Sequence, residues 1–111
     1  MRLSAAAALV KCDYDDMRRP PPLGPSLQLL RRAGFKPVWC SWRRSPGGHG
    51  WHVVWCVRPR PQTPAEVTAL QAILGSDAKR EASNLWRARN WSRMSPFWRE
   101  RWNVLYRKGA A

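Results

Sequence analysis

The spacing of apolar residues changes along the chain and predicts both strands and helices. An apolar run over residues 3–10 predicts a first strand. It is not a signal peptide, because it is short and is followed by Lys11 and an acidic cluster where the cleavage site would be. Strand-like patterns recur over 35–42 and 51–57, and helical spacing appears over 26–33, 64–74 and 78–82. We therefore expect an α+β fold, a small mainly antiparallel sheet with three to four helices packed on one side.

Local signals set the ends of the helices. Gly34 and Gly75 follow two of them, and Thr63-Pro64-Ala65-Glu66 is a capping box that makes Glu66 a cap and not a catalytic acid. On the apolar side of 64–74 we expect Val67, Leu70, Ile73 and Leu74. Near the C-terminus, Ser95-Pro96 begins a helix whose spacing predicts a buried stripe of Trp98, Trp102 and Leu105.

Composition narrows the class of partner. The 111 residues are enough for one small domain, and no stretch is long and apolar enough for a membrane span. Twenty Lys+Arg against seven Asp+Glu give a net charge of +13, which favours nucleic acid or nucleotide as partner, with an anionic membrane surface second. Eight tryptophans and an excess of arginine favour base stacking and phosphate contacts, although a GC-rich genome would also raise the arginine content.

The three cysteines exclude two classes of small protein. Cys12, Cys40 and Cys56 form no C-x-x-C pair, so the chain is neither a zinc module nor a disulfide framework. Cys40 and Cys56 could face each other across a hairpin, but free thiols in a reducing cytoplasm are the simpler interpretation.

An acidic cluster stands out in this basic chain. Three of the seven acidic residues are Asp13, Asp15 and Asp16, directly after the first apolar run. In an extended segment Asp13 and Asp15 point to the same face, about 7 Å apart, so both can reach one hard cation or a close pair of cations. The alternative is an acidic turn that ends the strand.

The second motif is S-P-G-G-H-G-W-H, over residues 45–52. Its three glycines let the backbone approach a ligand and present N–H groups, as in phosphate-binding loops, and the strand of 51–57 anchors them. His52 would lie at the mouth of that strand. The alternative is a glycine-rich hairpin turn with a structural histidine.

In order and spacing, these motifs resemble the archaeo-eukaryotic primase superfamily, the primase-polymerases of replicons and mobile elements. The family pattern is a strand ending in D-x-D, then S-x-S/G-G-x-G-x-H before a second strand, then a third acidic residue. Here these are Asp13-Tyr14-Asp15, the 45–52 loop and L-G-S-D-x-x-R at 74–80. The resemblance implies an RRM-like palm over residues about 9–89 of a single domain, 1–111, with a basic Trp/Arg-rich helical segment, 90–108, beyond it.

The resemblance also implies roles for individual residues. Asp13, Asp15 and Asp77 would be the catalytic carboxylates that bind Mg²⁺ or Mn²⁺, although Asp77 or Ser76 could instead be a helix N-cap. The nucleoside triphosphate would contact Ser45, Gly48, Gly50, His52 and Arg80. Single-stranded DNA or RNA template would contact Arg87, Arg89, Arg93, Arg99 and Arg101. The implied activity is a metal-dependent nucleotidyltransferase that makes primers or extends nucleic acid on a single-stranded template.

Other functions fit part of the pattern. A non-catalytic nucleic-acid-binding protein would use the arginines and tryptophans and leave the acidic cluster structural, and a protein that assembles on structural RNA fits the charge but not the glycine-histidine loop. Only the enzyme requires Asp13, Asp15 and His52 on one face. Family catalytic domains are usually longer, so a larger replication protein is an expected partner, in the cytoplasm, at the nucleoid or in an infected or plasmid-bearing cell.

Overall fold

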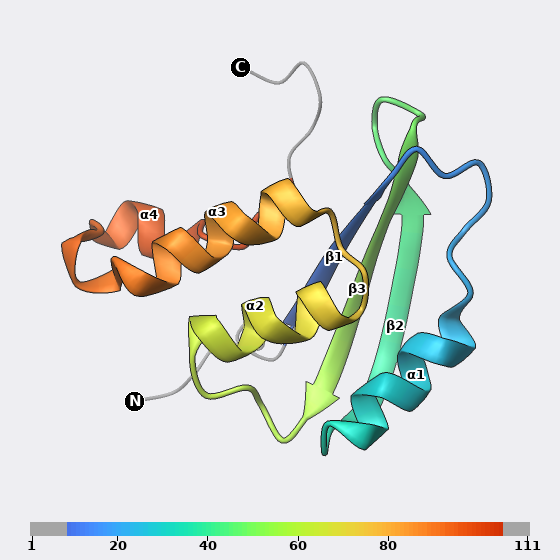
Figure 1. Ribbon diagram of the computed structural model, residues 1–111, viewed down its shortest axis with the longest axis horizontal. Coiled ribbons are helices and arrows are strands. Elements are labelled where there is room, and N and C mark those ends of the chain that lie inside the picture. The colour runs from blue at the N-terminus through green and yellow to red at the C-terminus, as the bar shows by residue number, and fades with distance from the viewer. Residues whose placement is uncertain (1–8, 106–111) are drawn as a thin grey trace.

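A three-stranded antiparallel sheet forms the centre of the protein. In the computed structural model, which describes residues 9–105, the strands are β1 (Leu9–Asp15), β2 (Lys36–Arg44) and β3 (Gly50–Arg58), in the order β1-β3-β2 (Figure 1). The helices are α1 (Leu23–Arg32), α2 (Pro64–Ile73), α3 (Ala78–Arg89) and α4 (Pro96–Glu100), with a 3₁₀ turn, η2 (Trp91–Arg93), before α4. The predicted α+β class is confirmed.

The sheet has one core face. Alternate residues of β1 and β3 are buried there, and Leu30 of α1 and Leu70 of α2 pack against them. The apolar side chains of this face are Val10, Cys12, Tyr14, Val53, Trp55 and Val57. α1 and α2 therefore cover one face of the sheet, as Figure 1 shows.

Predicted helix boundaries hold where local capping chemistry sets them. Thr63 caps α2, its Oγ1 accepting from the Glu66 N–H at 3.1 Å, so the predicted N-cap is confirmed, while the Glu66 carboxylate reaches back to the Gln62 N–H at 3.5 Å. Leu74 is the C-cap of α2 and is buried, but Ile73 is 56% exposed, so its predicted place on the apolar side is wrong. α1 begins earlier than expected, at Leu23, directly after the prolines.

The C-terminal helices extend away from the sheet. α3 packs against α2 beside β1, and α3 and α4 then project beyond the β1 edge (Figure 1). The predicted stripe of Trp98, Trp102 and Leu105 is wrong: α4 ends at Glu100, so the helical spacing stops, and Trp98 is 52% exposed. Trp102 instead makes an edge-to-face contact with Trp91, with ring centroids 6.2 Å apart.

The described range limits two predictions. β1 begins at Leu9 and runs through the D-Y-D motif; positions 3–8 of the predicted first strand lie outside the described residues, as do positions 106–108 of the basic tail. Within residues 9–105, none of the helices has the length and apolar character needed to cross a membrane.

Candidate functional site

The strand register brings the predicted site residues together on the face opposite the core. Asp13 pairs with His52, and His52 pairs on its other side with Arg43. Asp15 pairs with Gly50 in the neighbouring row. Because paired residues in antiparallel strands point to the same side, these side chains share one face. We call it the open face, made of Leu9, Lys11, Asp13 and Asp15 of β1, His52, Val54, Cys56 and Arg58 of β3, and Lys36, Trp39, Ser41 and Arg43 of β2.

A pocket of about 550 Å³ lies where the D-Y-D strand end meets the loop between β2 and β3. Its lining combines carboxylates with loop residues: Asp13, Asp15, Asp16, Ser45, Pro46, Gly47, His49 and His52. Both motifs that sequence analysis singled out therefore contribute to one concave site. Gly48 and Gly50 shape its loop without lining the pocket, and Asp77 and Arg80 also lie outside the lining.

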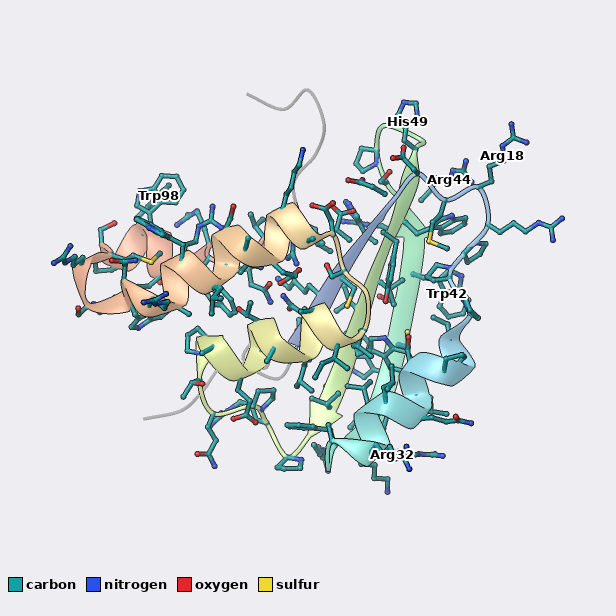
Figure 2. The ribbon with its side chains drawn as sticks, viewed as in Figure 1. Arg18, Arg32, Trp42, Arg44, His49 and Trp98 are labelled. Carbon is teal, nitrogen blue, oxygen red and sulfur yellow. The ribbon has the colours of Figure 1, made fainter. Side chains whose placement is uncertain are left out.

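Hydrogen bonds within the loop fix its shape. The Gly50 N–H donates to Ser45 Oγ at 3.1 Å, and Gly48, at a φ of 73°, donates to the Ser45 carbonyl at 2.8 Å. A Cβ on Gly50 would overlap the carbonyl oxygen of Tyr14, so only glycine allows this approach to β1. His49 lies at the exposed tip (Figure 2).

Arg44 braces the loop from outside. Its guanidinium donates to the carbonyls of Arg18, at 2.8 Å, and Gly48, at 3.1 Å. Figure 2 shows Arg44 and Arg18 close together below the loop tip. The pocket wall is thus held by backbone and arginine contacts that are independent of any ligand.

His52, which is buried, and Asp13, whose side chain is 21% exposed, form a polar pair that is incompletely bonded. Asp13 Oδ1 lies 3.5 Å from His52 Nε2, and His52 is 3% exposed. Burial and then the neighbouring charge of Asp15 raise the pKa of Asp13 to about 6. Burial and then Arg43 lower the pKa of His52, which favours the neutral ring at neutral pH. Among the described residues, Asp13 Oδ1 and His52 Nδ1 are buried with no hydrogen-bond partner.

The backbone of Asp13, by contrast, is hydrogen-bonded at both its N–H and its carbonyl along the outer edge of β1. Its N–H donates to Ser76 Oγ at 2.9 Å, and its carbonyl accepts from the Asp77 N–H at 2.6 Å. The Asp77 side chain caps α3, accepting from the Arg80 N–H at 2.9 Å. The helix-cap alternative for Asp77 is therefore what the structure shows, and its charge contributes to the raised pKa of Asp13.

Arg80 also serves the fold. Its guanidinium donates to the Lys11 carbonyl at 2.8 Å, pairs with Glu81 at 2.5 Å and reaches the carbonyl and Oδ1 of Asn103 at 3.0 Å. These contacts belong to a buried polar network that lies along the outer edge of β1, made of Gln71, Ser76, Arg80, Glu81, Asn84 and Asn103. The guanidinium predicted to contact nucleotide is thus engaged internally.

The donor set in the pocket suits a hard divalent cation. An orphaned, buried carboxylate oxygen on Asp13 beside the charge of Asp15 is an arrangement that a cation would complete, since Mg²⁺ and Mn²⁺ take oxygen ligands. Within residues 9–105, no three His, Cys, Asp or Glu side chains are grouped closely enough to hold a metal by themselves. Asp13 and Asp15 would hold the cation, and bound substrate would have to supply further ligands.

Sequence analysis assigned Asp16 no role in the site, yet Asp16 lines the pocket. It follows the last residue of β1 with a φ of 56°, so the strand alternation no longer applies to it. The available signal was the end of the strand at Asp15, after which a third carboxylate can turn toward its neighbours.

The predicted template-binding arginines lie far along the chain from the pocket. Arg87 and Arg89 are on α3, Arg93 is in η2, and Arg99 and Arg101 are at α4. Three of them are partly engaged: Arg87 Nη1 donates to Asn84 Oδ1, Arg99 Nε to the Trp91 carbonyl and Arg101 Nη1 to the Phe97 carbonyl. Exposed Trp86, Phe97 and Trp98 lie among them. The helical arm, made of α3, η2 and α4, therefore has an aromatic and basic surface.

No known family model, curated protein or solved structure matches the chain. The resemblance to primase-polymerases therefore rests on the three motifs and on the pocket that two of them form.

Proposed function

We propose that the protein is a metal-dependent nucleotidyltransferase of the primase-polymerase type, acting on single-stranded nucleic acid. The observation that carries the proposal is the pocket in which Asp13 and Asp15 meet Ser45 and His52 on one face. This convergence is the one requirement that separates the enzyme from a binding protein with a structural acidic cluster.

The residues of the pocket divide the work between cation and nucleotide. Asp13 and Asp15 would hold Mg²⁺ or Mn²⁺, which when bound neutralises phosphate charge and brings the reacting oxygens together. His52, neutral because of its lowered pKa, would donate a hydrogen bond to a phosphate oxygen without adding charge. The strand pairing of Asp13 with His52 keeps the carboxylate and imidazole in register.

Phosphate binding would use the exposed loop residues. Gly47 and His49 line the pocket together with the carboxylates, and the loop is already braced by Arg44. A preformed loop needs little ordering when the nucleotide binds. In this proposal Asp77 and Arg80 position Asp13 and do not touch the nucleotide.

A second function has its own support. Exposed tryptophans among arginines on α3 and α4 favour a non-catalytic nucleic-acid-binding protein. In that case a larger replication protein would supply any polymerase activity.

The test is incorporation of labelled nucleotides on single-stranded DNA, with Mg²⁺ or Mn²⁺, with and without a primer. The wild type is compared with Asp15→Asn, which is nearly isosteric and exposed, and with Glu100→Gln, an exposed carboxylate remote in sequence from the pocket. We expect metal-dependent synthesis in the wild type and in Glu100→Gln, and none in Asp15→Asn. If the wild type makes no product and all three proteins bind the single strand equally well, the nucleotidyltransferase proposal is refuted and the non-catalytic binding function is supported.

A further inference from the structure

We propose that the open face, centred on Trp39 and Arg43, is the track on which a single strand of nucleic acid lies next to the pocket. This inference rests on the strand-binding part of the proposed function and assigns it to the part of the open face that extends beyond the motif residues, from Arg43 past Trp39 to the Lys36–Arg58 end. It moves the binding surface from the helical arm to the sheet.

Trp39 is placed as a stacking platform. It is 47% exposed and pairs with Cys56, so its ring belongs to the face that α1 and α2 leave uncovered. An exposed indole on a rigid strand offers a large flat surface without being needed for the core, and bases of any sequence can stack on it.

Basic side chains flank Trp39 along the face. Arg43, four residues on, lies about 13 Å away along β2 toward the pocket, and Lys36 pairs with Arg58 at the other end. All three are exposed, and Arg43 makes no hydrogen bond or ion pair within the described part of the chain, although its charge acts on His52. An exposed arginine without a carboxylate partner can contact a phosphate at little desolvation cost.

The charge of the face selects the occupant. Between the row of Arg43, His52 and Asp13 and the Lys36–Arg58 end, the residues of the open face include no carboxylate, because Asp13 and Asp15 both lie at the pocket end. A second copy of this chain, with a net charge of +13, would bring like charges together. A polyanion with exposed aromatic bases, which is a single-stranded nucleic acid, complements both features.

The track is continuous with the pocket. Arg43 pairs with His52, which pairs with Asp13, so the row nearest the proposed track ends in the pocket lining. A single-stranded nucleic acid with a phosphate on Arg43 and a base stacked on Trp39 would present its next nucleotide to the carboxylates of the pocket. Stacking and phosphate contact do not distinguish ribose from deoxyribose, so DNA and RNA are both ligands of this chemistry.

The chain supplies a matched control on the same strand. Trp42 is 51% exposed, close to the value for Trp39, but pairs with Val53 and so lies on the core side (Figure 2). Arg32, exposed on α1, is the charge-matched control for Arg43 (Figure 2). Trp39→Ala and Trp42→Ala therefore remove side chains of nearly equal exposure from opposite faces of the sheet.

The experiment measures fluorescence anisotropy of labelled oligothymidylate and oligouridylate with the full-length protein, without divalent metal or nucleotide. We expect Trp39→Ala to weaken binding about tenfold, Trp39→Phe to keep most of the affinity, and Trp42→Ala to leave it unchanged. Arg43→Ala should reduce the slope of log affinity against log salt by about one, and Arg32→Ala should not. Circular dichroism checks that each variant is folded.

Two results would overturn the inference. One is equal affinity of Trp39→Ala and Trp42→Ala for both oligonucleotides. The other is loss of binding in Trp98→Ala while Trp39→Ala binds as tightly as the wild type, which would place the bound nucleic acid on the helical arm. Because binding is measured without metal, it is independent of catalysis. Trp39-dependent binding without nucleotide incorporation would refute the proposed chemistry alone, and incorporation with Trp39-independent binding would refute the track alone.

Discussion

β1 faces two contrasting environments, and Asp13 belongs to both. Along the outer edge of the strand, the backbone of Lys11 and Asp13 is bonded to Gln71, Ser76, Asp77 and Arg80. Toward the pocket, the Asp13 carboxylate and the His52 ring are buried with one atom each left without a hydrogen bond among the described residues. The edge is hydrogen-bonded almost throughout, with Arg80 Nε the one buried atom of its side chains left without a partner among the described residues, whereas the pocket leaves unbonded an oxygen of the carboxylate that would bind a cation.

The difference separates stability from function. Buried polar groups are normally bonded, since each unpaired group costs about 1–3 kcal/mol. Among the described residues, the polar network meets this requirement at its buried side-chain atoms other than Arg80 Nε, and it also protects an edge strand from pairing with other chains. The pocket departs from it at the carboxylate that would bind a cation, and the rigid edge keeps that carboxylate in place.

Breaking the polar network along the outer edge of β1 should have the largest effect on stability. Glu81→Gln leaves the buried Arg80 without its carboxylate partner, and Glu81 also accepts from Gln71, Ser76 and Asn84. We expect a loss of about 3–5 kcal/mol of unfolding free energy, measured by urea denaturation.

Glu100→Gln is the control for that change. Glu100 is 79% exposed and its nearest contact with Arg101 is 3.9 Å, so its loss should change stability by less than about 0.5 kcal/mol. If Glu81→Gln were as stable as Glu100→Gln, the network would not hold the edge of β1.

The approach of the loop to β1 can be broken separately. Gly50→Ala places a methyl group against the Tyr14 carbonyl, and backbone cannot move aside as a side chain can, so we expect a loss of about 3 kcal/mol. Gly24→Ala in α1 meets no atom within 4 Å and should be neutral or stabilising by up to about 1 kcal/mol. Thermal unfolding of the two variants measures this, and equal melting temperatures would refute the close approach.

Removing the negative charge of Asp13, on the pocket side of β1, should stabilise the metal-free protein. The pKa of Asp13 is raised to about 6 in the folded state, so the folded protein binds the proton more tightly than the unfolded chain and loses stability as the pH rises from about 4 to about 6, above which the loss is complete. Asp13→Asn should therefore be more stable than wild type by about 1 kcal/mol at pH 7. Below about pH 4 the difference should disappear. A variant less stable than wild type at pH 7 would contradict this assignment.

The sequence predicted the features whose signals are local. The strand through Asp13 and Asp15, the glycine loop of the hairpin and the Thr63 cap each depend on residues a few positions apart, and all three are in the structure. The Trp98 and Trp102 stripe failed because a helical period was extended past the end of a five-residue helix.

Long-range contacts could not be predicted in this way. The bonds from Gln71 to Lys11 and Asn103 join residues 60 and 32 positions apart, and no periodicity marks them. The same limit applies to Asp77: its neighbours in sequence fit a metal ligand and a cap equally, and only its bond to the Asp13 carbonyl shows how it meets β1.

The central claim is that the orphaned Asp13 carboxylate is a cation ligand, and urea denaturation with and without Mn²⁺ at pH 7 tests it most directly. A cation that binds only the folded protein raises its stability by about 1.4 kcal/mol at ten times its dissociation constant. We expect Mn²⁺ to stabilise the wild type and not Asp13→Asn, which should already be the more stable protein without metal. Equal responses of the two proteins to Mn²⁺ would show that the pocket carboxylate binds no cation and contradict the account.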